Sequence, residues 1–145
     1  HRNHFAEVEE NRGIALRPLL VELAATLRAS APDPAHPPAI QLEINDLYTT
    51  QDAAVAVSFF VTEVVEHAML TSPKAPTVEI NLKRTGELGA SLSVASDALI
   101  RSSKVEQSSE RTQFDRVIQG LARQLRSPLD EKLGRLAVDL PVFPQ

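Results

Sequence analysis

The chain has 145 residues, the size of one ordinary domain with room for a hydrophobic core. Its formal net charge of −4 and its lack of a Lys/Arg cluster argue against nucleic acid as a partner, since binding to a phosphate backbone needs concentrated positive charge. The absence of cysteine excludes disulfides, thiolate metal sites and a cysteine nucleophile.

No part of the chain is expected to contact a membrane directly. The most apolar stretch, residues 53–61, is too short to span a bilayer, and no signal-peptide pattern opens the sequence. The sequence therefore predicts a cytoplasmic domain. Because the chain starts at His1 without an initiator Met, a membrane-anchored parent protein stays open as an alternative.

The first half of the chain predicts two helices and a strand, the longer helix following the strand. Residues 1–10 are typical of the end of a helix, which Gly13 would terminate through a left-handed turn. Residues 16–28 carry leucines at three- and four-residue spacings, which indicates one apolar helical face. Four prolines within residues 31–38 predict a loop, and the alternation over residues 40–44 predicts a half-buried strand.

The longer helix is predicted over residues 50–71, where Asp52 could cap its first turn. Residues 78–82 and 92–94 alternate apolar with polar side chains. They are separated by turn residues at 85–87, so they predict a hairpin.

The end of the chain predicts a loop, a helix and a strand. Residues 101–112 are polar and show neither a helical nor a strand pattern, whereas residues 114–125 predict a helix and residues 136–140 a last strand. The order of elements favours an α/β fold, a two-layer sandwich in which a mixed β-sheet carries about three helices on one face.

Four segments carry a resemblance to a known family. AVAVSFFVTEVVEHA at residues 54–68 is similar to the first helix motif of the Bergerat (GHKL) fold, an apolar run followed by N-E-L-V-x-N-A. GLARQL at 120–125 resembles the start of the helix after the ATP lid, RLAVDLPV at 135–142 resembles the terminal strand, and LRPLLVELAATLRAS at 16–30 resembles the first helix. The chain thus resembles the ATP-binding domain of sensor histidine kinases. The sequences of these segments are most similar to those of the HWE and second HisKA subfamilies.

The resemblance implies a domain organisation and partners. Residues 1–13 would be the tail of an upstream dimerisation helix with its linker, and residues 14–145 the ATP-binding-type domain. The phosphorylatable histidine of the family would then lie upstream of His1. A homodimer formed through the upstream helices and the receiver domain of a response regulator are the implied partners.

In this family the helix motif supplies an Asn that helps to hold Mg²⁺ beside the phosphates. His67 stands at that position, and its imidazole nitrogen is a poor ligand for Mg²⁺, which prefers oxygen. Thr62 stands at the earlier Asn of the motif. Glu63 is retained and is the one candidate general base, with an ordinary polar helix residue as the alternative.

The D-x-G-x-G box, which reads adenine at the end of a strand, is also replaced. In one register Ser96 takes the place of its Asp, and Ala98 and Ile100 take the places of its glycines. A shift of one residue makes Asp97 the adenine reader but again puts larger side chains at the glycines. Neither register restores the box.

The second glycine-rich box of the family receives phosphate oxygens on bare backbone N–H groups. Residues 100–119 contain no glycine, so Arg111 and Phe114 would crowd that approach, and Gly120 falls inside the predicted helix.

Together these replacements predict a pseudo-ATPase domain with no resident metal or cofactor. Loss of the adenine contact alone costs roughly 1.5–3 kcal/mol. With the metal and phosphate contacts also lost, affinity falls by about a thousandfold or more. With its helical partner domain, such a protein would act on a response regulator as a phosphatase or phosphotransferase. Two alternatives stay open: an active ATP-dependent sensor kinase that uses ATP and Mg²⁺ in an unorthodox pocket, and a GHKL-type anti-sigma or partner-switch module.

Overall fold

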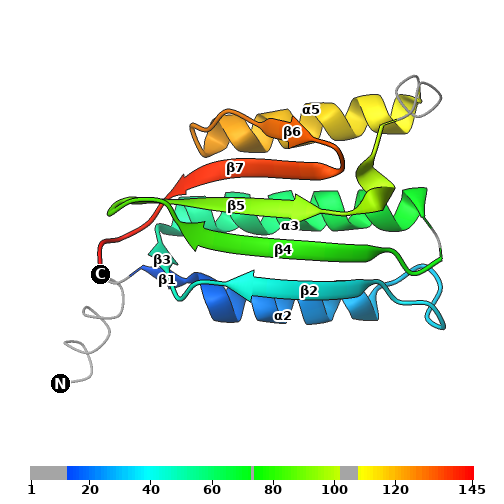
Figure 1. The fold of residues 1–145 in the computed structure, drawn as a ribbon, viewed down its shortest axis with the longest axis horizontal. Helices are drawn as coiled ribbons and strands as arrows, with labels where there is room; N and C mark the ends of the chain where they lie inside the picture. Colours follow the sequence, from blue (N-terminus) through cyan, green and yellow to red (C-terminus); the bar gives the residue numbers. More distant parts are fainter. Residues whose placement is uncertain (1–12, 73, 102–107) are drawn as a thin grey trace.

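The computed structural model describes residues 13–72, 74–101 and 108–145 (Figure 1). In this part of the chain a five-stranded sheet, in the order β2-β4-β5-β7-β6, forms one layer, and three helices form the other. This arrangement confirms the predicted two-layer α/β sandwich. The elements are β1 (Ile14–Ala15), α2 (Leu16–Ala29), β2 (Ala39–Ile44), β3 (Tyr48–Thr49), α3 (Gln51–Thr71), β4 (Thr77–Arg84), β5 (Gly89–Ala95), the short 3₁₀ helix η1 (Asp97–Leu99), α5 (Ser109–Gln124), β6 (Asp130–Lys132) and β7 (Arg135–Pro141).

The sheet is mixed, as the order of elements predicts. β2 pairs with β4 in parallel, whereas β4–β5, β5–β7 and β6–β7 are antiparallel. The β4–β5 hairpin confirms the turn predicted between them. Its side chains Val78, Ile80 and Leu82 are fully buried under the helices, which explains their alternation with polar residues.

Helix α3 lies at the centre of the helical layer, where it contacts both α2 and α5. Thr50 caps it, because the Thr50 hydroxyl accepts a hydrogen bond from the Ala53 N–H at 3.2 Å. The predicted cap Asp52 was therefore wrong, although its carboxylate in the first turn still suits the helix dipole.

The apolar character of α3 extends well beyond the stretch of residues 53–61. Its length and mean hydropathy would allow it to cross a membrane, but over half of its apolar window is buried inside the domain. The buried face includes Val57, Phe60 and Val64, each with no exposed surface. The core helix of a globular domain can have the same length and mean hydropathy as a membrane-spanning helix.

Helix α5 starts five residues earlier than predicted. The Ser108 hydroxyl accepts a hydrogen bond from the Arg111 N–H at 3.1 Å and caps it. The prediction that residues 101–112 lack helix was therefore wrong for residues 109–112. The first turn is helical without an apolar stripe, because the side chain that it buries is Arg111.

The chain enters the domain beside its own C-terminal end. Gly13 has φ +78°, and an added Cβ would overlap the Phe143 ring and the Thr49 carbonyl oxygen, so only glycine fits there. The Phe143 N–H donates to the Tyr48 carbonyl oxygen at 2.9 Å. The left-handed conformation predicted for Gly13 is thus present, while the helix predicted over residues 1–10 lies outside the described residues.

Candidate functional site

His67 projects from α3 toward the first turns of α5. Its ring stacks on Phe114 with 4.1 Å between ring centroids and 13° between ring planes. Only 9% of the residue is exposed, and within the described chain its buried Nε2 has no hydrogen-bond partner. The ring is therefore held by stacking rather than by a hydrogen bond from this nitrogen.

Arg111, also on α5, lies over the Phe114 ring. It is only 1% exposed, and its guanidinium carbon lies 5.0 Å from the centroid of the Phe114 ring, a distance suited to a cation–π contact. Its Nη1 donates to the Leu99 carbonyl oxygen at 3.3 Å. Arg111 and Phe114, the two residues predicted to crowd the phosphate approach, thus lie against each other, and Phe114 lies against His67.

The surroundings of His67 favour the neutral imidazole. Burial lowers the pKa of His67 below its usual 6.5, and the positive charges of Arg111 and Arg101 add to this effect, while Asp115 opposes it. A neutral imidazole with a blocked ring face offers nothing that would suit a hard cation such as Mg²⁺.

The lowered pKa of His67 makes stability depend on pH. Below about pH 6.5 the unfolded chain binds a proton that the folded chain resists, so the free energy of unfolding falls as the pH falls. His67→Phe keeps an aromatic ring but removes this titration. Urea unfolding at about pH 7.5 and about pH 5.5 should show a smaller difference in the variant than in the wild type. An equal difference in both proteins would contradict the buried neutral histidine.

Thr62 and Glu63 lie on α3 one turn before His67, and both are half-buried. Burial, and then the negative charge of Glu66, raises the pKa of the Glu63 carboxyl. A raised carboxyl pKa suits a general base, but partial burial on a helix produces the same shift without any catalytic role.

The residues predicted to stand in place of the D-x-G-x-G box form η1 directly after β5. The Ser96 hydroxyl accepts from the Ala98 N–H at 3.2 Å, and the Ser96 N–H donates to the Gly134 carbonyl oxygen at 2.8 Å. Ser96 is buried, and these two hydrogen bonds hold it at the strand end. Asp97 is exposed, and Ile100 is 43% exposed at the end of the turn.

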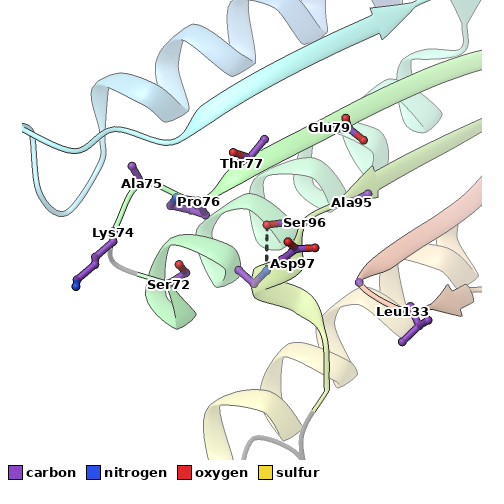
Figure 2. A pocket seen from close by; sticks show the side chains of 12 residues that line it. Ser72, Lys74, Ala75, Pro76, Thr77, Glu79, Ala95, Ser96, Asp97 and Leu133 are labelled. Carbon is purple, nitrogen blue, oxygen red and sulfur yellow. Dashed lines mark hydrogen bonds between the residues drawn. The ribbon is translucent and has the colours of Figure 1, made fainter.

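A cavity of about 430 Å³ lies at this end of the sheet, as Figure 2 shows. Ser96, Asp97 and Ala98 line it together with Lys74 and Glu79. None of the α3 positions of the predicted site lines this cavity.

The structure therefore brings the predicted site residues to two places. On α3, His67 stacks on Phe114 of α5. At the strand end, Ser96, Asp97 and Ala98 line the cavity, whereas Ile100 does not. Within the residues that the structure describes, no group of three or more His, Asp or Glu side chains could hold a metal ion.

Sequence reasoning missed the carboxylates that hold Arg111 in place. Arg111 Nε donates to Asp115 Oδ1, and Arg111 Nη2 donates to Glu131 Oε2, both at 3.3 Å. The i, i+4 spacing of Arg111 and Asp115 was a usable signal for the first pair. In the second pair, Glu131 lies on β6, a strand that no sequence pattern indicates.

The mixed sheet, the long central helix and the turn after β5 define the fold of histidine kinase catalytic domains. Among solved structures, the chain is similar to the blue-light activated histidine kinase of Erythrobacter litoralis EL346, with a TM-score of 0.71 and 15% identity over 89% of this chain and 46% of that one. It is similar to the mycobacterial sensor histidine kinase MprB, with a TM-score of 0.66 and 11% identity over 91% of this chain and 97% of that one. It is also similar to full-length ShkA in complex with AMPPNP, with a TM-score of 0.67 and 11% identity over 92% of this chain and 31% of that one.

The chain therefore spans about half the length of the Erythrobacter kinase and nearly all of the MprB structure. No protein-family model and no curated protein matches the sequence. At these identities the likeness establishes the fold of the chain, and its activity has to be argued from its own residues.

Proposed function

We propose that this chain is the pseudo-ATPase domain of a two-component signalling protein of the histidine kinase type. The observation that carries the proposal is the Phe114 ring, which stacks on His67 and lies under the guanidinium of Arg111. The resemblance to histidine kinases places an Mg²⁺ ligand and open backbone at these positions. This chain instead has a buried neutral imidazole, an aromatic ring stacked on it and a guanidinium.

These residues do not fit Mg²⁺ and a triphosphate. His67 offers no oxygen, and the buried guanidinium of Arg111 already has its hydrogen-bond partners within the protein. Binding a nucleotide there would require Arg111 and Phe114 to leave buried positions. Moving buried side chains costs more free energy than moving an exposed lid. We therefore derive no step through ATP.

The fold supports a role in two-component signalling. We assign catalysis to a helical domain upstream of this chain. The domain would act within a homodimer, as part of a phosphatase or phosphotransferase toward a response regulator receiver domain. The assignment to the HWE or second HisKA subfamily rests on the sequence segments alone. Glu63, with its raised carboxyl pKa, is the one observation that favours the alternative of an active kinase.

Calorimetric titration of the chain with ATP and Mg²⁺ tests this proposal. We expect no saturable heat up to about 1 mM nucleotide, which corresponds to a binding free energy weaker than about −4 kcal/mol. ShkA, whose structure was solved in complex with AMPPNP, is the positive control under the same buffer conditions. Saturable binding in the micromolar range would reject the pseudo-ATPase and support the ATP-dependent kinase.

A further inference from the structure

Four charged side chains form a closed cluster around the start of α5. Arg101 binds Glu131 with two hydrogen bonds, Nε to Oε2 at 2.5 Å and Nη2 to Oε1 at 3.0 Å, and its Nη2 also donates to Asp115 Oδ1 at 2.8 Å. Arg111 donates to the same Asp115 Oδ1 and the same Glu131 Oε2. Each carboxylate is thus shared by both arginines, and the two positive charges balance the two negative ones.

The cluster, called here the arginine–carboxylate cluster (Arg101, Arg111, Asp115 and Glu131), joins three separate parts of the fold. Arg101 follows η1, Arg111 and Asp115 belong to the first two turns of α5, and Glu131 lies on the edge strand β6. The bonds to Glu131 and Asp115 raise the pKa of the Arg101 guanidinium, which keeps that partner charged.

The exposed fraction of the side chain differs between the inner and outer members of the cluster. Arg111 is 1% exposed on its side chain, whereas Arg101, Asp115 and Glu131 are 29%, 36% and 30% exposed. The inner arginine is therefore held by outer groups that water and other solutes can reach. Few apolar side chains hold the first turn of α5, because its one buried residue before Phe114 is Arg111.

We propose that the arginine–carboxylate cluster is a conformational restraint that keeps the first two turns of α5 closed over His67. Weakening the outer groups lets these turns open locally, moves Arg111 and Phe114 away and exposes the His67 ring on which Phe114 stacks, while the rest of the core stays folded. This inference concerns how the turns are held and does not depend on whether nucleotide binds.

Glu131→Gln and Arg101→Gln test the restraint, and Asp130→Asn is the matched control. Asp130 neighbours Glu131 on β6, but among the residues described by the structure its carboxylate forms an ion pair with the exposed Arg135 alone, at 3.8 Å. Two quantities are measured by mass spectrometry on the full chain: amide hydrogen exchange over residues 109–116, and the rate at which diethyl pyrocarbonate modifies His67.

We expect each cluster variant to raise both quantities by on the order of tenfold, with exchange over residues 57–64 of α3 unchanged. Asp130→Asn should match the wild type. Equal acceleration in α3 and α5 would overturn the proposal, because the cluster would then only add to global stability. Unchanged exchange and modification in both variants would overturn it as well.

Discussion

Phe114→Ala is expected to lower the free energy of unfolding by about 3–5 kcal/mol, the usual cost of removing a buried phenylalanine. Phe114 is 4% exposed, and it contacts both the His67 ring and the Arg111 guanidinium. The substitution would leave a cavity between α3 and α5. It would also remove the stacking partner of an imidazole whose Nε2 has no hydrogen-bond partner in the described part of the chain. Urea unfolding followed by circular dichroism measures the change.

Phe59→Ala is the control, because Phe59 lies on the neighbouring helix α3 with 58% of its surface exposed. Its removal should change the free energy of unfolding by less than about 0.5 kcal/mol. Similar small losses for the two variants would mean that α5 packs loosely on His67 and that this region does not exclude a nucleotide.

Gly134→Ala is expected to cost about 3 kcal/mol of stability, more than the loss of an ordinary turn glycine. Gly134 has φ +77°, and an added Cβ would lie 2.6 Å from the Ser96 carbonyl oxygen and 3.0 Å from Ile100 Cγ1. The β6–β7 turn therefore has to approach the strand end where the resemblance places the adenine-reading Asp. Differential scanning calorimetry should show a clear loss in melting temperature.

Gly86→Ala provides the comparison within the β4–β5 hairpin. Nothing lies within 4 Å of a Cβ added at Gly86, and its φ is outside the left-handed region. The change should be neutral or stabilise by up to about 1 kcal/mol through the unfolded state. If Gly134→Ala were as mild as Gly86→Ala, the close contact of the turn with Ser96 would be refuted.

The periodic elements of this fold could be predicted because each has one buried face. The alternation in β4 and the apolar character of α3 follow directly from burial against each other. The edge strand β6 could not be predicted, since Asp130, Glu131 and Lys132 are all exposed and form no pattern. The two-residue strands β1 and β3 are too short for a period to appear.

The candidate site could be predicted in its residue types but not in its contacts. That His67 takes the place of the Mg²⁺ ligand and that Arg111 and Phe114 crowd the phosphate approach stay predictions from the resemblance, but the side-chain types at these positions follow from the sequence. The burial of Arg111 does not follow from the sequence, because an arginine in the first turn of a helix is usually solvated. Its burial depends on Glu131, a residue of the strand that sequence patterns do not reveal.

The most direct test of the central claim is a titration of the ¹⁵N-labelled chain with ATP and Mg²⁺, followed by NMR. The claim is that the protein's own side chains fill the place where a nucleotide would bind. It predicts that the amide signals of Glu63, His67 and Ser96 stay in place at about 1 mM ligand. Saturable shifts confined to these signals would contradict it.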